Sequence, residues 1–417
     1  MALQTGGVPA NASGSDKLGR YYTRWDIGDF LVGHIDIDAP RALLDLGAGA
    51  GSLASAAAKR WSETNIFTVD VDVSASTQLK ALMRTSASRR HSHIRADALS
   101  TRLPELLRAR SAEIDAAVCN PPFIKPAWRS GFGEILEDVG LSGCVPADGG
   151  VDAALLFLAQ NLRMIERNAR LGIILPDTMI STVRYRRFRQ ELVRRYAIEK
   201  IIKLPRGSFL GTDALASIVV LRKGVPVAET VPLCKLTADR RLSAVVDVTV
   251  DQAIERLDYD YHSQADEGRL RREHIVLLSD LSAEVSRGSI ENAVAGAAGI
   301  SVLHTSGIDS TWLGRWRDLS DYPAETTASN ALIHAEPGDI LVARVGRNLH
   351  NKICGVKAGS VAITDCVYRV RLPKRYRNVV LRQLASIEGQ EWLSSRAYGV
   401  SARQLTKADL LTFPIAL

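Results

Sequence analysis

A buried strand followed by closely spaced glycines limits the fold of this chain more than any other feature. Residues 42–46 read Ala-Leu-Leu-Asp-Leu, residues 47–51 alternate glycine with alanine, and residues 52–60 are rich in alanine. Strand, glycine turn and helix in this order are typical of the nucleotide-binding unit of a doubly wound sheet. Glycine lets the backbone turn tightly and approach a ligand closely. The spacing Asp-x-Gly-x-Gly-x-Gly differs from the dinucleotide fingerprint, whose glycines occupy the first, third and sixth positions.

Three further apolar segments continue the predicted sheet. The segments are 65–69, 93–96 and 114–119. Asp70 follows the first, about 20 positions beyond the glycine turn, where a carboxylate can accept hydrogen bonds from ribose hydroxyls. Asp72 is the close alternative for that role, and an acidic residue in a solvated loop is the structural alternative. Asn120 follows the third segment, so its side chain is expected at the carboxyl edge of the sheet, beside the ligand cleft.

The tetrapeptide Asn120-Pro121-Pro122-Phe123 joins an amide, a stiff backbone and an aromatic ring at the end of a predicted strand. These groups suit a flat ring that carries an amine, because the amide oxygen can accept amine protons and the aromatic ring offers a stacking surface. A strand that simply ends in a proline turn is the structural alternative. With the glycine turn upstream, the tetrapeptide resembles the catalytic motif of amino-methyltransferases, particularly the DNA adenine-N6 family.

This resemblance implies a doubly wound, Rossmann-like α/β domain that binds S-adenosylmethionine. In the family, the acid at Asp97 would contact the adenine amine of the cofactor. The segment Tyr21-Tyr22-Thr23 resembles the Tyr-Thr-Pro piece that closes over the methionine end of the cofactor, although Arg24 replaces the proline. The predicted cofactor-binding residues are Tyr22, Thr23, Asp45, Gly47, Gly49, Gly51, Asp70, Asp97 and Asn120.

The resemblance assigns catalysis to Asn120, Pro121, Pro122 and Phe123. The Asn120 side-chain oxygen and the Pro121 carbonyl would accept the two N6 protons of a target adenine, and Phe123 would stack on the base. Because the adenine N6 is enclosed in the duplex, the base must swing out of the stack. Residues 124–150 are rich in glycine and are expected to form a mobile loop near the target.

Two likenesses extend over most of the chain. Segments 171–177, 201–209 and 216–223 resemble modification subunits of type I restriction systems, so this likeness covers roughly residues 18–240. Short β-like runs and turns dominate after about residue 240. There, the segments 338–346 and 404–410 resemble a target-recognition domain of a type I specificity subunit, over roughly residues 255–417. A generic β-rich accessory domain is the alternative.

The net charge of +7 favours a polyanionic partner. The candidate DNA-binding residues are Lys125, Arg184, Arg186, Arg187, Arg344, Arg347 and Lys352. A solvated helix face is the alternative for the arginine run around residues 184–195. Double-stranded DNA is the expected partner, and a second copy of the chain or a restriction or defence subunit is a further candidate. No membrane partner is expected, because no apolar stretch approaches the ~20 residues that span a bilayer.

The five cysteines are scattered, without a CxxC pair, and predict neither disulfides nor a zinc site. Reduced thiols of this kind indicate the cytoplasm. The expected organisation is a flexible tail at 1–17, a methyltransferase domain at 18–245 and a β-rich target-recognition domain at 246–417.

The leading hypothesis is a sequence-specific DNA adenine-N6 methyltransferase of a restriction-modification or defence system. One alternative is a methyltransferase that acts on a protein glutamine or an RNA base. Another is a non-catalytic DNA-binding subunit of a modification complex that keeps the cofactor fold.

Overall fold

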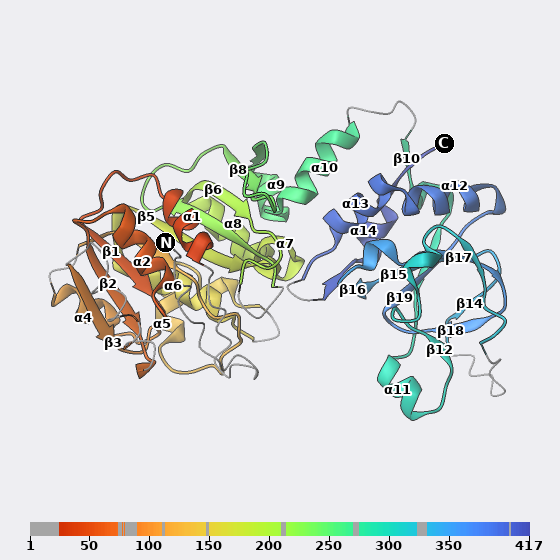
Figure 1. The fold of residues 1–417 in the computed structure, drawn as a ribbon, viewed down its shortest axis with the longest axis horizontal. Helices are drawn as coiled ribbons and strands as arrows, with labels where there is room; N and C mark the ends of the chain where they lie inside the picture. The colour runs from red at the N-terminus through yellow and green to blue at the C-terminus, as the bar shows by residue number, and fades with distance from the viewer. Residues whose placement is uncertain are drawn as a thin grey trace, which may run out of the picture. The chain divides into compact units, whose positions relative to one another are not determined.

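The computed structural model describes residues 25–73, 77, 79, 90–110, 113–146, 150–209, 214–269, 275–322, 332–399 and 402–417. The expected tail at 1–17 lies outside these residues. The chain divides into two compact units, residues 1–259 and 260–417, and Figure 1 labels many of their elements.

A sheet with the strand order β3-β2-β1-β4-β5-β7-β6-β8-β9 forms the centre of the first unit. Neighbouring strands from β3 to β5 are parallel, and β7 lies antiparallel between β5 and β6. Because the chain runs outward from β1 to β3 and returns to β4, a topological switch point lies between β1 and β4. The strands are β1 (Ala42–Leu46), β2 (Asn65–Asp70), β3 (His91–Arg95), β4 (Ile114–Cys119), β5 (Ile165–Pro176), β6 (Ala197–Lys203), β7 (Ala216–Arg222), β8 (Thr230–Lys235) and β9 (Val246–Thr249).

Helices cover both faces of this sheet. On one face, Gly172 of β5 leaves room for α1, since a Cβ at this glycine would lie 2.8 Å from Leu31 Cδ2. On the other face, Leu44 and Leu46 belong to a core cluster that includes Leu155 of α6. Every residue of β1 is buried, which is the pattern of a strand between two helical layers. The described helices of this unit are α1 (Trp25–Gly33), α2 (Ser52–Arg60), α4 (Leu103–Arg108), α5 (Phe132–Glu137), α6 (Ala153–Met164), α7 (Asp177–Ser181), α8 (Arg186–Arg195) and α9 (Val250–Glu255), with the 3-10 helices η1 (Ser142–Cys144) and η2 (Val183–Tyr185).

Residues 246–255 belong to the first unit, although the sequence analysis placed them in the second domain. β9 pairs antiparallel with β8, with Val248 opposite Val231. Ala253 and Ile254 of α9 are buried in the core of the first unit. The expected boundary after residue 245 is therefore too early, because these apolar side chains complete the first core.

The second unit is rich in short strands. Its two larger sheets have the orders β11-β19-β15-β17-β13 and β12-β18-β14 among the described residues, and β10-β21 and β16-β20 form separate pairs. A doubly wound α/β sheet followed by a β-rich region is thus confirmed. The strands are β10 (Ile275–Leu277), β11 (Glu284–Arg287), β12 (Val302–Leu303), β13 (Trp316–Asp318), β14 (His334–Ala335), β15 (Ile340–Ala343), β16 (Val345–Gly346), β17 (Ile353–Ala358), β18 (Val361–Ile363), β19 (Val367–Arg371), β20 (Arg403–Gln404) and β21 (Pro414–Ala416).

Two long helices, α12 (Lys374–Ala385) and α13 (Ile387–Arg396), accompany these strands, although the sequence of this region predicted mainly short β-like runs and turns. α12 buries Val380, Leu381 and Leu384 against the core of the second unit. Ser386 caps the amino end of α13, since its side chain accepts the Gly389 N–H at 3.0 Å. The other described helices are α10 (Tyr259–Arg269), α11 (Asn292–Ala297) and α14 (Lys407–Leu411), with the 3-10 helices η3 (Leu278–Leu281), η4 (Ser310–Trp312) and η5 (Leu349–Asn351). None of the helices in the described parts of the chain is long and apolar enough to cross a bilayer.

Candidate active site

The glycine loop after β1 adopts a backbone that other residues rarely tolerate. Gly47, Gly49 and Gly51 have φ angles of 77°, 51° and 87°, which lie in the left-handed region. The Phe157 ring of α6 packs against the first of them, so that a Cβ on Gly47 would lie 2.9 Å from Phe157 Cε1. Both conformation and space therefore require glycine at this turn.

Asp45 of β1 is buried, with 1% of its surface exposed. Its Oδ2 accepts the Ala54 N–H at 3.0 Å, whereas its Oδ1 is buried and has no hydrogen-bond partner in the described parts of the chain. Burial raises the pKa of Asp45 to about 7; the Ala54 hydrogen bond opposes this rise and the nearby Asp70 charge adds to it. A buried carboxyl with one unused oxygen suits a cationic group of a ligand, because an unpaired buried charge is unfavourable.

Asp70 holds the glycine loop in place. Its Oδ2 accepts the Gly49 N–H at 2.8 Å, and its Oδ1 accepts the Asp72 N–H at 2.8 Å. The side chain is 8% exposed. Each carboxylate oxygen has a second lone pair, so Asp70 can brace the loop and still accept a hydrogen bond from a ligand. Asp72 is half-buried.

Asn120 follows the last residue of β4. β4 lies beside β1 in parallel register, with Val118 opposite Asp45, so the amide and the glycine loop share the carboxyl edge of the sheet. The Asn120 side chain is half-buried and Pro121 is buried. The two motifs singled out in the sequence therefore meet at the switch point, where ligands bind in doubly wound sheets.

One aromatic residue of this site, Phe209, was not among the residues predicted from the sequence. The rings of Phe123 and Phe209 meet edge to face, with centroids 6.1 Å apart and an interplanar angle of 73°. Phe209 is 3% exposed and follows Gly207, whose φ is 77°. Segment 201–209 resembles part of the type I modification subunits, but that resemblance does not single out Phe209. A contact between rings so far apart in the chain leaves no pattern in the local sequence.

Asp97 is linked to the segment that follows the tetrapeptide at 120–123. Its Oδ1 accepts the Leu99 N–H at 2.9 Å, and its Oδ2 pairs with Arg129 Nη2 at 2.6 Å. Both partners of this ion pair are about half exposed. The interval 124–150, expected as a loop, contains α5 and η1 among its described residues, and Phe132 is buried in the first core.

The arginine run around α8 has two roles in the structure. Arg189 is fully buried and donates to the carbonyls of Met179, Thr182, Ile254 and Glu255, and burial lowers its pKa to about 10. Arg184, Arg186 and Arg187 are exposed. Arg186 forms an ion pair with Glu255.

The candidate cations of the second unit are partly engaged within the fold. Arg344 Nε donates to the Asp365 carbonyl at 2.6 Å, and its side chain is 15% exposed. Lys352 Nζ donates to the Thr305 carbonyl at 2.5 Å. Arg347 is exposed, as is Lys125 of the first unit. DNA contacts by these residues stay predictions.

Two predicted cofactor contacts, Tyr22 and Thr23, lie outside the described residues. Within the described ranges, no three His, Cys, Asp or Glu side chains are grouped as metal ligands.

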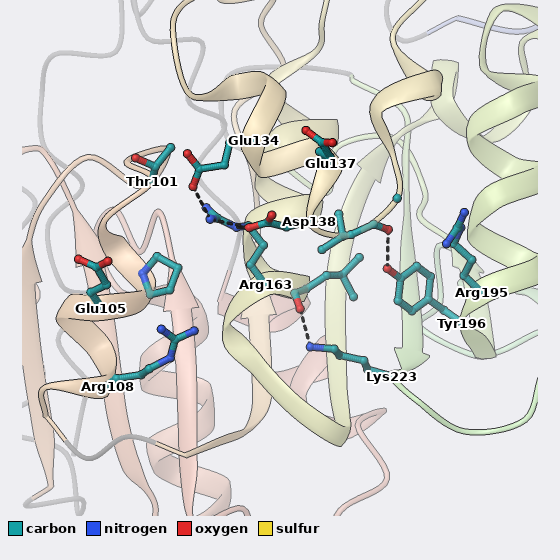
Figure 2. A pocket seen from close by; sticks show the side chains of 14 residues that line it. Thr101, Glu105, Arg108, Glu134, Glu137, Asp138, Arg163, Arg195, Tyr196 and Lys223 are labelled. Atoms are coloured by element: carbon teal, nitrogen blue, oxygen red, sulfur yellow. Dashed lines mark hydrogen bonds and ion pairs between the residues drawn. The ribbon is translucent and has the colours of Figure 1, made fainter.

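A broad groove of about 830 Å³ lies elsewhere on the first unit (Figure 2). Arg163 pairs there with Glu134 and Asp138, at 2.9 and 2.7 Å. Arg163 precedes β5 and Arg195 precedes β6, so the groove lies toward the amino ends of these strands. None of the predicted site residues lines it. The candidate active site lies at the carboxyl ends of β1 and β4, and not in this groove.

Comparisons with known proteins agree with this geometry. The family model for N-6 DNA Methylase matches residues 8–267. A protein of Methanocaldococcus jannaschii, described as a type II restriction enzyme and methyltransferase, is 29% identical over an alignment of 125 residues, and the match covers 25% of this chain and 11% of that protein. The solved type IIG restriction endonuclease BpuSI matches 96% of this chain and 59% of its own, with a TM-score of 0.52 and 13% identity. A type I restriction-modification methyltransferase subunit from Streptococcus thermophilus matches 62% of this chain and 55% of its own, with a TM-score of 0.45 and 20% identity.

These matches differ in what they establish. The chain spans 11% of the length of the M. jannaschii relative, and the BpuSI match shows a shared fold. The family model covers more than half of the chain and includes the glycine loop, Asp70, Asp97 and the tetrapeptide at 120–123. This chain therefore belongs to the N-6 DNA methylase family.

Proposed function

We propose that this chain transfers a methyl group from S-adenosylmethionine to the N6 amine of an adenine in double-stranded DNA, within a restriction-modification or related defence system. One observation carries the proposal: Asn120 follows β4 at the edge where the neighbouring β1 ends in the glycine loop. Family membership supports the reaction class. A second copy of the chain, or a restriction or defence subunit, is the further partner we propose.

The residues at this edge fit S-adenosylmethionine. The unused buried oxygen of Asp45 would hold the ammonium group of the methionine part, and the remaining lone pairs of Asp70 would accept ribose hydroxyls. The glycine loop keeps side chains away from the ligand. Asp97 would contact the adenine amine of the cofactor. When bound, the cofactor supplies a methyl group activated by a positively charged sulfur.

The chain's own residues position and polarise the target amine. The lone pair of that amine is conjugated with the purine ring, so the nitrogen is a weak nucleophile. Asn120 Oδ1 and the Pro121 carbonyl accept hydrogen bonds from its two N–H groups, which raises the electron density on the nitrogen. Once the nitrogen carries the methyl group, it releases one proton to solvent. Phe123 stacks on the base, and the Phe209 ring braces Phe123 from the side. Such positioning is a large part of catalysis when the methyl donor is already reactive.

We assign recognition of the target sequence to the second unit. The two segments that resemble a target-recognition domain, 338–346 and 404–410, are joined in the structure, because β16 and β20 pair with Val345 opposite Gln404. Positioning on the duplex and readout of bases are separate tasks, and a chain that carries both a catalytic unit and a β-rich unit can perform both. This assignment makes the methyltransferase sequence-specific.

A transfer assay tests the proposed function. The purified chain is incubated with tritiated S-adenosylmethionine and a pool of duplex DNA of mixed sequence, with RNA and protein extract in parallel. Label is expected in N6-methyladenine released from the duplex. Label in RNA or in protein glutamine, or no label in any polymer, would overturn the proposal. Modified-base sequencing of DNA from an expressing host then identifies the recognition sequence.

Cofactor affinity is expected to fall as the pH drops below about 7. The raised pKa of Asp45 makes this carboxyl increasingly neutral there, whereas a bound ammonium group would favour the ionised form. Each pH unit below 7 should therefore weaken affinity by up to about tenfold. Calorimetry from about pH 5.5 to about pH 7.5 measures this change. Asp45→Asn cannot ionise and should bind weakly at every pH; the same acid dependence in that variant would assign the titration to another group.

A further inference from the structure

The exposed face of α12 in the second unit carries an unusual concentration of positive charge. Lys374, Arg375, Asn378 and Arg382 are exposed, whereas the opposite face of the helix is buried. The helix contains no acidic residue. Its exposed face, defined by these four residues, is called the α12 basic face below.

The cations of the α12 basic face have no acidic partner among the residues that the structure describes. Among the described residues, no ion pair joins Lys374, Arg375 or Arg382 to a carboxylate; Arg375 lies over the Tyr376 ring, 4.6 Å from its centroid. Other arginines of this unit are paired, for example Arg369 with Glu284 at 2.9 Å. The charge on the α12 basic face is therefore available to an external anion.

Helix stability does not account for these cations. Lys374 and Arg375 occupy the first turn of α12, which contains no acidic residue. The positive end of the helix dipole disfavours cations at that position. Solubility does not require a cluster of cations either, because a surface with interspersed charges of both signs is equally soluble. Their placement is explained if the face binds a polyanion.

The α12 basic face also has the dimensions of a phosphate-binding surface. From Lys374 to Arg382 the helix rises roughly 12 Å, and successive phosphates on one DNA strand lie about 3.4 Å apart along the duplex axis. An α12 axis parallel to the duplex axis would therefore run past about three to four phosphates of one strand. Asn378 is fixed within it because its Oδ1 accepts Trp316 Nε1 at 2.9 Å, which leaves the amide nitrogen as a further donor. Asn378, Trp316 and Arg382 line an adjoining groove of about 460 Å³.

We propose that the α12 basic face binds the phosphate backbone of double-stranded DNA and so fixes the register of the second unit on the duplex. Contacts to phosphate orient a protein without carrying sequence information, so this role is distinct from base readout. The proposal rests on the proposed DNA-modifying function and names a surface that the sequence analysis did not.

Salt-dependent DNA binding by the full chain tests the assignment. Affinity for a fluorescent duplex oligonucleotide is measured by anisotropy over a range of salt concentrations. Each phosphate contact adds about 0.9 to the slope of log affinity against log salt. The variant K374A/R375A/R382A is expected to flatten the wild-type slope by about 2.7. An unchanged slope in a folded variant would overturn the proposal.

A matched control separates a local contact from a loss of net charge. The variant R108A/R110A/R167A also removes three exposed cations, but from the first unit near the amino ends of β4 and β5. It should keep the wild-type slope. If it flattens the slope as much as the α12 variant does, general electrostatics and not the α12 basic face carries the binding, and the proposal fails.

Two further results complete the test. The charge-conserving variant K374R/R375K/R382K should retain the slope, because phosphate contact needs charge more than a particular head group; a flattened slope there would point to base readout and overturn the phosphate assignment. Wild-type chain that methylates DNA while the alanine variant keeps its slope would overturn the α12 assignment alone. Wild-type chain that neither binds nor methylates a duplex would overturn the proposed function as well.

Discussion

Replacing Asn120 with alanine is expected to lower the turnover number for DNA methylation by about 10²- to 10³-fold, the range seen when one preorganised polar group is removed from a transition-state site. The Asn120 oxygen acts most strongly as the amine nitrogen becomes cationic, so its loss affects the transition state more than substrate binding. Cofactor affinity should change little, because Asp45, Asp70 and the glycine loop remain. Turnover is measured with tritiated cofactor and cofactor affinity by calorimetry.

Asn65 provides a matched control for this experiment. It is an exposed asparagine at the start of β2. This position lies at the amino ends of the parallel strands, away from the glycine loop, and Asn65 Nδ2 donates to the Arg41 carbonyl at 3.2 Å. Asn65→Ala should leave turnover near the wild-type value. Near-normal methylation by Asn120→Ala would remove this amide from the mechanism, whereas an equal loss in both variants would indicate damage to the fold.

The central strands of the first unit could be predicted because they are buried on both faces. β1 and β4 begin and end at the expected residues, 42–46 and 114–119. A continuous apolar run bounded by glycine or by Asn-Pro leaves few alternatives for the backbone. Peripheral elements were less certain. β3 begins two residues earlier than the expected 93–96, since His91 and His93 do not mark a strand by hydrophobicity.

The unit boundary and α12 were harder to predict for a different reason. In 246–259 apolar and polar residues are mixed without a break in composition at residue 245, and only the pairing of β9 with β8 and the burial of Ala253 and Ile254 show that they belong to the first core. In α12, basic side chains interrupt the apolar residues Val380, Leu381 and Leu384. A narrow stripe of apolar residues on a helix that is otherwise charged gives only a weak pattern in the sequence. The pattern can be recognised once the core that the helix packs against is known.

Contacts between distant residues could not be predicted at all. The sequence separates Asp97 from Arg129 and Phe123 from Phe209, yet each pair is in contact. The arginine content of the sequence likewise did not distinguish two kinds of arginine. Arg189 is buried among backbone carbonyls, whereas Arg375 forms no ion pair among the described residues. Charge and composition limit the class of partner, and the fold selects which cations can reach it.

Replacing Asp70 with alanine is expected to weaken cofactor binding by about 10- to 100-fold. The substitution removes the acceptor of two backbone donors, Gly49 N–H and Asp72 N–H, each held at 2.8 Å. A buried donor left without a partner costs about 1–3 kcal/mol, and about 1.4 kcal/mol corresponds to tenfold in affinity. The glycine loop would then need to be reordered before the cofactor binds. Calorimetry measures the dissociation constant, and thermal unfolding measures any loss of stability.

Two companion variants separate bracing of the loop from direct contact with the ribose. Asp70→Asn keeps one acceptor oxygen and should show an intermediate loss, because one loop amide remains bonded while the charge is gone. Asp72→Ala keeps the Asp70 carboxylate and both of its backbone bonds, so a much smaller change is expected. A larger loss of affinity in Asp72→Ala than in Asp70→Ala would assign the ribose contact to Asp72. An unchanged dissociation constant in Asp70→Ala would show that the glycine loop holds its ligand-binding shape without this carboxylate.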